Sequence, residues 1–338
     1  MILNLDCRHG LAMLPDNSVS AIVTDPPYGL RFMGKKWDYD VPGVDIWVEC
    51  LRVLKPGGHL LAFAGTRTQH RMAVRIEDAG FEIRDMIAWV YGSGYPKHRS
   101  SLKPALEPIT MARKPAERAT LLNIDACRVG NEGGCRDDGQ YITGSPDAVS
   151  CYGDGLNQRR STLVPGLGRY PANLIHDGSD EVVAMFPDSA GSGGSVPNVK
   201  ISGYGDGAVG TGSAARFFYC AKAGKRDRNE GLEAFDAVMA NFAAGTGLSK
   251  NGDGSPRNMN ADAKNPHPTV KPTELMRYLC RLVTPPGGLI VDPFAGSGST
   301  GKAAILEGFQ FIGFELDPQY TAIANARIDA ARNSLESV

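Results

Sequence analysis

The sequence feature that most constrains the fold is the stretch LIVDPFAGSGST, an apolar run followed by a glycine-rich loop. Residues 289–291 are apolar and lead into Asp292, which is typical of a strand buried on both faces of a parallel sheet. Gly296 and Gly298 then allow the backbone to turn sharply and to approach a ligand closely. The stretch therefore predicts a strand whose carboxyl end opens into a ligand-binding loop.

Residues 300–306 predict a helix after this loop, and the apolar run 309–314 predicts a second strand that ends at Glu315. In nucleotide-binding β–α–β units, a carboxylate about 20 residues beyond the glycines binds the ribose, and Glu315 lies close to that offset. Residues 296–301 also match G-x-G-x-x-G, which alone is a weak signal for a dinucleotide. The N–H groups at a helix start can equally receive the carboxylate of an amino-acid-bearing nucleoside. Glycines that serve packing alone are a third interpretation.

Length and composition set the broad class. The 338 residues exceed one ordinary domain, so we expect one large α/β domain with an insertion or a second lobe. The net charge is −1, and any nucleic-acid binding must therefore come from local basic patches. The seven cysteines form no C-x-x-C pair, so we expect reduced thiols and no metal site. No segment reaches about 18 apolar residues and no signal peptide is visible, which predicts a cytoplasmic protein without a membrane span.

The second chemical feature is Asp25-Pro26-Pro27-Tyr28, which directly follows an apolar run that predicts a strand over 19–24. Each proline favours an extended backbone before it and removes an N–H donor, so the tip is rigid and its carbonyls are free acceptors. Open α/β sheets bind ligands beyond the carboxyl ends of their strands. A carboxylate, a carbonyl and an aromatic ring together suit an exocyclic amino group on a flat base. A proline turn with a surface tyrosine is the alternative.

The remaining periodicity predicts the fold class. Residues 44–54 and 69–79 predict helices, and the strands around them continue a β–α rhythm to about residue 95. We therefore expect an α/β fold, a Rossmann-like and mostly parallel sheet flanked by helices. Residues 93 to about 266 are rich in Gly, Ser, Pro, Asn and Asp and lack clear periodicity, which predicts an irregular insertion with flexible loops.

Basic residues gather in and beside this irregular region. In a chain of nearly zero net charge, local basic runs indicate contacts with phosphates, although a plain solvated face is the alternative. Residues 29–40 also interleave aromatic side chains with lysines, which predicts either a loop that folds over substrate or a solvated loop. The candidate phosphate-binding cations are Lys35, Lys36, Lys97, Arg99, Lys103, Arg113, Lys114, Arg216 and Lys222.

Three separated motifs together resemble the beta class of S-adenosylmethionine-dependent DNA amino-methyltransferases. They are DPPY at 25–28, HPTVKP at 267–272 and the glycine loop with its downstream acid, in this order. The resemblance implies a catalytic and cofactor-binding domain built from residues 1–95 and 264–338, with an inserted target-recognition region at 96–263. A permuted chain can build the same sheet, so the opening strand, residues 2–5, is expected beside the strand that ends at Glu315.

The resemblance implies a function, transfer of the methyl group of S-adenosylmethionine to the exocyclic amino group of a flipped-out base in double-stranded DNA. Adenine N6 is preferred because DPPY is the more usual form among adenine enzymes, and cytosine N4 stays open. The catalytic candidates are Asp25, Pro26, Pro27 and Tyr28, whose ring would stack on the base. Glu315 is expected on the ribose hydroxyls, Asp6 and Cys7 near the adenine edge, and HPTVKP on the methionine side. The implied cofactor-binding residues are Asp6, Cys7, His267, Thr269, Lys271, Asp292, Phe294, Ala295, Gly296, Gly298, Ser299, Thr300, Glu315 and Leu316.

Several other functions compete with this interpretation. A nicotinamide-dependent oxidoreductase would leave DPPY and HPTVKP unexplained. Methyltransferases that act on RNA or on protein amides more often carry Asn in place of Asp25, and an inactive DNA-binding module would not need the intact motifs. The sequence leaves open the recognised DNA site, a homodimer, and a cognate restriction endonuclease as partner.

Overall fold

The computed structural model describes residues 1–31, 38–94, 99–117, 121–130, 135–136, 163–164, 168–189, 212–221, 226–235 and 264–336. The chain divides into two compact units. The first consists of Met1–Asn123, Asn173–Ser179 and Cys220–Val338, and the second of Ile124–Ala172 and Asp180–Tyr219.

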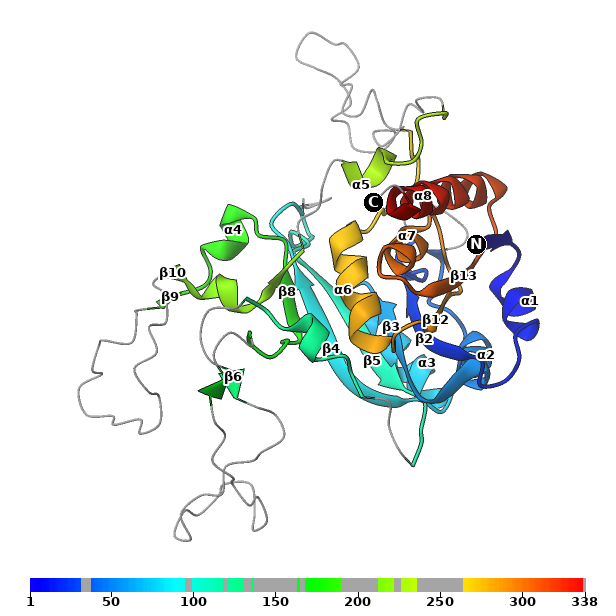
Figure 1. Ribbon diagram of the computed structural model, residues 1–338, viewed down its shortest axis with the longest axis horizontal. Coiled ribbons are helices and arrows are strands. Elements are labelled where there is room, and N and C mark those ends of the chain that lie inside the picture. Colours follow the sequence, from blue (N-terminus) through cyan, green and yellow to red (C-terminus); the bar gives the residue numbers. More distant parts are fainter. Residues whose placement is uncertain are drawn as a thin grey trace. The chain divides into compact units, whose positions relative to one another are not determined.

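A nine-stranded sheet dominates the first unit, in the order β1-β13-β12-β2-β3-β5-β4-β8-β11 (Figure 1). The five strands from β1 to β3 in this order pair in parallel, whereas β5 runs antiparallel to both of its neighbours. The strands are β1 Ile2–Asn4, β2 Val19–Thr24, β3 Leu54–Phe63, β4 Glu82–Val90, β5 Leu106–Arg113, β8 Leu174–His176, β11 Tyr219–Cys220, β12 Leu289–Asp292 and β13 Gln310–Glu315.

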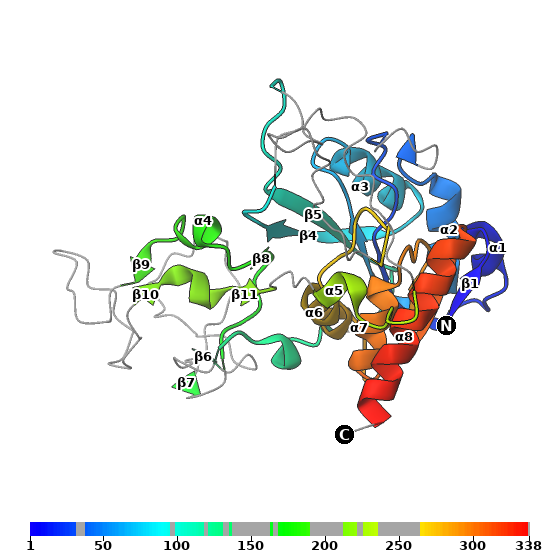
Figure 2. The same ribbon diagram turned by 90° about the horizontal axis from the view of Figure 1, so that it is seen from above.

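Helices cover both faces of this sheet. Helices α1, α2 and α3 pack together on one face, and α6, α7 and α8 pack together on the other (Figure 2). The helices are α1 Cys7–Ala12, α2 Val44–Val53, α3 Gln69–Asp78, α5 Arg226–Asn229, α6 Thr273–Val283, α7 Ser299–Leu306 and α8 Pro318–Glu336. The predicted α/β class with a mostly parallel sheet between helices is confirmed.

The second unit contains short elements. Its described strands and helices are β6 Cys135–Arg136, β7 Leu163–Val164, α4 Asp180–Val183, β9 Asp188–Ser189, β10 Gly212–Ser213 and the 3₁₀ helices Asp125–Cys127 and Ala214–Phe217. Most of the predicted Gly- and Ser-rich loops lie outside the described residues.

Burial explains why the central strands are apolar runs. Every residue of β2 is buried, because helices lie on both faces of the sheet, and alternation with polar residues would place polar groups in the core. Helix α2 buries Ile46, Trp47, Cys50 and Val53, which recur at helical spacing on one face. The sheet edge at the carboxyl end of β2 is thereby fixed between two packed layers.

The two ends of the chain meet in the sheet. Strand β1 pairs in parallel with β13, with Leu3 opposite Phe314, which confirms the predicted pairing (Figure 1). The side-chain amide of Asn325 on α8 both accepts from the Ile2 N–H, at 2.8 Å, and donates to the Ile2 carbonyl, at 2.9 Å. The carboxyl ends of β1 and β13 therefore lie side by side.

The first unit also contains segments from the predicted insertion. Strands β5 and β8 and the stretch 226–235 fall within residues 96–263 but belong to the first unit. An antiparallel strand such as β5 needs no crossover helix, so it does not appear in a β–α rhythm. These segments therefore lie in the first unit, and the division into a catalytic and a recognition region stays a prediction.

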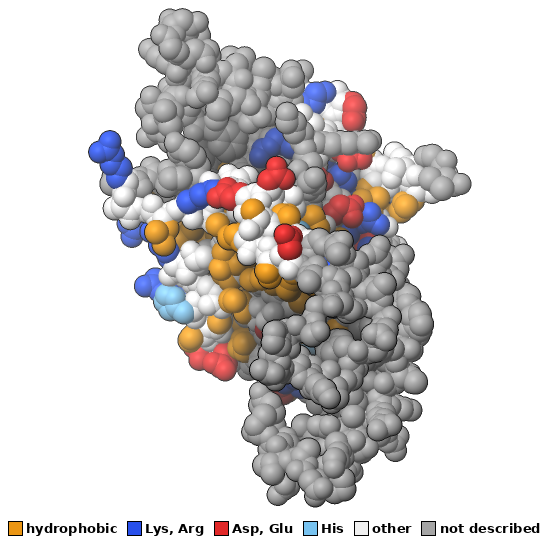
Figure 3. Space-filling model, turned by 90° about the vertical axis from the view of Figure 1, so that its left-hand side faces the viewer, with side chains coloured by type: hydrophobic (Ala, Val, Ile, Leu, Met, Phe, Trp, Pro, Cys, Tyr) orange, Lys and Arg blue, Asp and Glu red, His pale blue; other side chains and the backbone are white. Residues whose placement is uncertain are grey.

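The candidate phosphate-binding cations have different surroundings. Arg99 and Lys103 are exposed. The Arg113 guanidinium donates to Glu82, the Lys114 ammonium donates to the Leu54 carbonyl at 2.8 Å, and Arg216 donates to a carbonyl at the start of its own 3₁₀ helix. On the face that Figure 3 presents, Lys and Arg side chains lie apart from one another around a group of hydrophobic side chains. The remaining cations, Lys35, Lys36, Lys97 and Lys222, lie outside the described residues.

Among the described helices, none combines the length and the apolar character that crossing a bilayer requires.

Candidate active site

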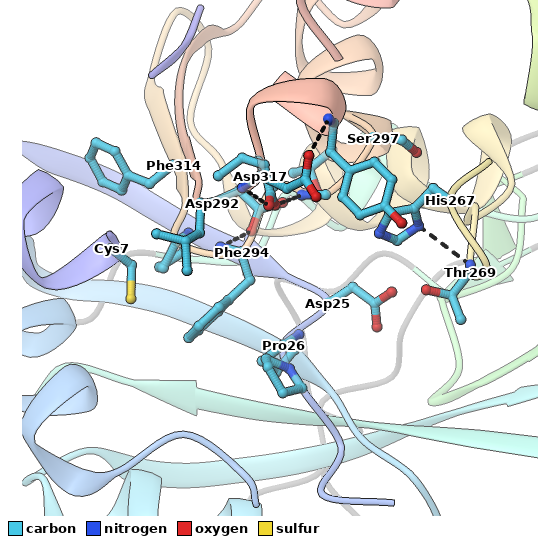
Figure 4. Close-up of a pocket in the computed structure, with 18 of the residues that line it drawn as sticks. Cys7, Asp25, Pro26, His267, Thr269, Asp292, Phe294, Ser297, Phe314 and Asp317 are labelled. Atoms are coloured by element: carbon cyan, nitrogen blue, oxygen red, sulfur yellow. Dashed lines mark hydrogen bonds between the residues drawn. The ribbon is translucent and has the colours of Figure 1, made fainter. Parts of the chain in front are cut away.

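A cavity of about 620 Å³ opens where β1, β2, β12 and β13 end, at the carboxyl edge of the parallel part of the sheet. Ligand cavities for small molecules typically measure about 300–1,000 Å³, so its size suits a nucleoside-sized ligand. Figure 4 shows Asp25 with Pro26 on one side and His267 and Thr269 on the other. The ends of strands from both termini of the chain thus converge on one cavity.

The cavity brings together all but one of the predicted catalytic and cofactor-binding residues. The lining includes Asp6, Cys7, Asp25, Pro26, Pro27, Tyr28, His267, Thr269, Lys271, Asp292, Phe294, Ala295, Gly296, Ser299, Thr300, Glu315 and Leu316. Gly298 is not part of the lining. Its φ is +81°, and a Cβ there would lie 2.8 Å from the Ala324 Cβ, so this glycine serves the turn into α7 and its packing on α8.

The glycine loop is tied to the end of β13 through Glu315. One carboxylate oxygen of Glu315 accepts from the Gly296 N–H, and the other accepts from the Asp317 N–H, both at 2.8 Å. Burial raises the pKa of Glu315, although these two N–H groups act to lower it. Because a carboxylate oxygen has more than one lone pair, each oxygen retains capacity to accept from ligand hydroxyls.

Asp292 is buried at the end of β12 and holds the start of the loop. Its Oδ1 accepts from the Thr24 hydroxyl on β2, at 2.6 Å, and from the Phe294 N–H, at 3.0 Å. Burial raises the pKa of Asp292 to about 6 against these hydrogen bonds. The carboxylate therefore connects β2 to β12 and holds the first residues of the glycine loop against both strands.

His267 lies over the glycine loop. Its Nδ1 accepts from the Thr269 N–H at 3.3 Å, which assigns the remaining proton to Nε2, and its ring packs edge-on against Tyr320 with centroids 4.7 Å apart. Burial lowers the pKa of His267 to about 4, so the imidazole is neutral at pH 7. The Arg228 guanidinium donates to the His267 carbonyl at 2.8 Å and holds this segment in place.

Asp25, at the rigid tip after β2, accepts hydrogen bonds on both oxygens. The Tyr28 hydroxyl lies 2.6 Å from Oδ1, and the Lys271 ammonium lies 2.7 Å from Oδ2. Lys271 also lies 3.2 Å from Oε2 of Glu107, and the Tyr28 hydroxyl lies 3.0 Å from the same oxygen. Lys271, which the resemblance places on the methionine side of the cofactor, lines the same cavity, and its ammonium contacts the catalytic candidate Asp25.

The charges of this cluster favour a fixed protonation pattern. Burial acts to lower the pKa of Lys271, but Asp25 and Glu107 outweigh it and raise the pKa, so the ammonium stays charged. Burial, together with the two carboxylates, raises the pKa of Tyr28 well above its ordinary value, so the phenol stays neutral. The cluster therefore contains one cation, one neutral hydroxyl and two carboxyl groups.

Sequence reasoning missed two acids that hold this site. The buried Asp38 carboxylate accepts from the N–H groups of Tyr28, at 2.7 Å, and of Gly29, at 2.8 Å, and so fixes the loop after DPPY. Glu107 lies near the start of β5 and contacts Tyr28 and Lys271. The short apolar run after Glu107 was the available signal for a strand, but the antiparallel direction that brings its start to the cavity edge was not predictable locally.

Comparisons with known proteins identify the family of this chain. A family model described as DNA methylase, of the N6/N4 type, matches residues 19–326. The chain is 42% identical over 65 residues to "DNA adenine methyltransferase YhdJ" of Escherichia coli K12, which is 19% of this chain and 22% of that protein. It is 40% identical over 70 residues to "Putative methylase YubD" of the same organism, which is 21% of this chain and 31% of that protein. The chain thus matches less than a third of the length of either curated relative.

A solved structure shows the shared fold over the whole chain. The PvuII DNA methyltransferase (cytosine-N4-specific) covers 99% of this chain and 92% of its own, with a TM-score of 0.51 and 17% identity. At that identity the likeness concerns the fold alone. The family model, in contrast, spans most of the sequence, from β2 into α8, and includes DPPY, HPTVKP and the glycine loop. This chain belongs to the DNA methylase family.

Proposed function

We propose that this protein transfers the methyl group of S-adenosylmethionine to the exocyclic amino group of a flipped-out base in double-stranded DNA, with adenine N6 as the preferred acceptor. One observation carries the proposal. A single cavity joins the Asp25 tip, which suits an amino group, to the Gly296 loop and Glu315, which suit a nucleoside with an amino-acid tail. An oxidoreductase would need the Gly296 loop and Glu315 but not the Asp25 tip.

The residues of the cavity fit S-adenosylmethionine. Glu315 presents a carboxylate with both oxygens oriented by backbone N–H groups, which suits the ribose hydroxyls. The backbone approaches closely at Gly296, and the neutral His267 adds no second cation beside the sulfonium. Phe294 and Ile46 provide an apolar wall. When bound, the cofactor supplies a methyl group on a positively charged sulfur.

The protein's contribution is to position and activate the acceptor. An aromatic amine is a poor nucleophile because its lone pair is delocalised into the ring. Asp25 and the Pro26 carbonyl would accept the two amino hydrogens, which favours a more tetrahedral nitrogen with an available lone pair. Asp25 has 18% side-chain exposure inside the cavity, so a base within a duplex must be flipped out to reach it.

Two facts favour adenine over cytosine. The tip carries DPPY, the form more usual among adenine enzymes of this class. The relative with 42% identity over 65 residues is named a DNA adenine methyltransferase. Cytosine N4 also presents an amino group beside a ring nitrogen, so it is the second outcome of the test below.

DNA is the proposed partner, with the second unit as the target-recognition region. Among the described cations, Arg99 and Lys103 are the exposed candidates for phosphate contacts, and Arg113 and Lys114 lie at the opposite edge of the sheet. Phosphate contacts make binding salt-dependent. We expect Arg99→Ala to flatten the salt dependence of DNA binding more than Lys114→Ala does.

The first test is expression in a host that lacks DNA methylation, followed by sequencing of its DNA for modified bases. We expect N6-methyladenine at one recurring sequence. N4-methylcytosine would replace the proposed acceptor, and unmodified DNA from cells that contain folded protein would contradict the function.

The second test is Asp25→Ala in purified protein. Because Glu107 still neutralises Lys271, the variant should fold and bind S-adenosylmethionine with nearly the wild-type affinity. Label transfer to duplex DNA should fall by about a hundredfold or more. Normal turnover in this variant would remove Asp25 from the proposed role.

A further inference from the structure

The Tyr28 hydroxyl lies between two carboxyl groups. Its oxygen is 2.6 Å from Oδ1 of Asp25 and 3.0 Å from Oε2 of Glu107. A phenol has one hydrogen and can donate it to one acceptor at a time, while its oxygen can accept from a protonated carboxyl group. The hydroxyl can therefore receive a proton from one carboxyl group as it passes its own proton to the other.

Glu107 is the last of the three groups in the series Asp25, Tyr28 and Glu107, and its position follows from the direction of β5. Strand β5 is antiparallel to β3, so the start of β5, where Glu107 lies, reaches the sheet edge at which Asp25 follows β2. The Glu107 side chain is 21% exposed and is not among the residues that line the cavity, although it contacts Tyr28 and Lys271, which do line it. It is also hydrogen-bonded to Tyr91, just after β4.

We propose that Glu107 is the final proton acceptor of the methyl transfer, reached from Asp25 through the hydroxyl of Tyr28. This inference rests on the proposed function and assigns to Glu107, which lies outside the DPPY motif, a role in the same reaction. Lys271 is a positioning residue in this scheme. Its ammonium contacts both carboxyl groups, at 2.7 Å and 3.2 Å, and keeps them on either side of Tyr28.

The step balances in atoms and charge. The amino nitrogen forms a bond to the methyl carbon while the carbon–sulfur bond breaks, and that electron pair stays on sulfur. The methylated nitrogen then loses one proton to Asp25. Asp25 passes a proton to the Tyr28 oxygen as Tyr28 releases its own proton to Glu107, so both return to their starting states.

Charge favours the uptake of one proton by the cluster. With both carboxylates ionised and Lys271 charged, the cluster has a net charge of −1, and it becomes neutral when Glu107 holds the proton. A cluster of net negative charge stabilises the cationic nitrogen that forms in the transfer. The partly exposed Glu107 then returns the proton to solvent.

The test compares Glu107→Gln, Glu107→Ala and the wild-type protein in single-turnover methyl transfer to duplex DNA. Glutamine keeps the hydrogen bonds to Tyr28 and Lys271 but cannot accept the proton, so we expect the rate constant to fall by about tenfold or more. Affinities for S-adenosylmethionine and DNA, measured by calorimetry, should change by less than about twofold. In Glu107→Ala, added formate should restore the rate in a concentration-dependent way, because it can occupy the vacated carboxylate position.

Glu49→Gln is the matched control. Glu49 is a partly buried carboxylate on α2 that pairs with Arg52, away from the cavity, and its variant should keep the wild-type rate with no effect of formate. A wild-type rate in Glu107→Gln, or a loss in Glu107→Ala that formate does not restore, overturns the relay. If the wild-type protein transfers no label to DNA, the proposed function itself fails, and the relay with it.

Discussion

At the scale of single residues, Gly296 shows how closely the loop and HPTVKP depend on each other. Its φ is +51°, and a Cβ would lie 2.9 Å from Nε2 of His267. The left-handed conformation disfavours a side chain by about 1–2 kcal/mol, and the contact with His267 adds to that. We expect Gly296→Ala to weaken S-adenosylmethionine binding by about tenfold or more, measured by calorimetry, because the loop must shift away from Glu315.

Gly308 provides the matched control for this substitution. Its φ is +76°, and nothing lies within 4 Å of the position that a Cβ would take, so Gly308→Ala carries the same backbone strain without a collision. This variant should lose thermal stability but retain its cofactor affinity. Equal affinities in the two variants would show that the Gly296 loop does not contact the cofactor.

At the scale of elements, α8 connects the glycine loop to the segment 226–235. Arg327 on α8 is fully buried, and its guanidinium donates to the carbonyl and hydroxyl of Ser297 and, at 2.8 Å, to the Asp227 carbonyl. Without the guanidinium, these buried carbonyls lose their donor, at a cost of about 1–3 kcal/mol each. Because Ser297 lines the cavity, we expect Arg327→Met to lower both the melting temperature and the S-adenosylmethionine affinity, measured by calorimetry.

Arg332 on the same helix separates this effect from a general loss of positive charge. It is 46% exposed and pairs with Asp329 one turn away, and such exposed pairs contribute little to stability. Arg332→Met should leave melting temperature and affinity close to the wild-type values. The connection is refuted if Arg327→Met binds the cofactor as tightly as Arg332→Met does.

The same elements show what the sequence could and could not predict. The ends of β2, β12 and β13 were predictable because buried parallel strands are continuous apolar runs and their ligands lie beyond the carboxyl ends. The two partners of Lys271 were not predictable. The contact with Glu107 depends on the direction of β5, and the contact with Asp25 joins residues far apart in the chain. Asp38 was not predictable either, since its role is to accept from the backbone of a loop whose conformation no periodicity reports.

At the scale of the whole molecule, the site exists because strands from both ends of the chain lie in one sheet. Strand β1 completes the sheet beside β13, and Asp25 near the start of the chain faces HPTVKP and the glycine loop near its end. The cavity is lined by residues that follow strands β1, β2, β12 and β13, so it needs the assembled sheet. Global stability and cofactor binding should therefore be linked.

Stability at acid pH depends on a buried histidine in this sheet. His59 on β3 is 4% exposed, and burial, followed by the charges of Arg113 and Arg84, lowers its pKa to about 4 from 6.5. Between these values the unfolded chain binds more protons, so His59 contributes stability that is complete above about pH 6.5 and is lost as the pH falls toward 4. The lowered pKa of His267 also reduces the stability of the folded protein as the pH falls. The raised pKa of Asp292, about 6, has the opposite effect and increases that stability on acidification.

We expect His59→Phe, which cannot take up a proton, to reduce the loss of unfolding free energy between pH 7.5 and pH 5. At about 1.4 kcal/mol for each unit of pKa shift, the full contribution of His59 is at most roughly 3.5 kcal/mol, of which somewhat more than half should be lost by pH 5. Urea unfolding at the two pH values measures it, with the exposed His70→Phe as control. If the wild-type protein, His70→Phe and His59→Phe all lose the same free energy between these pH values, His59 is not the buried group that the sheet keeps unprotonated.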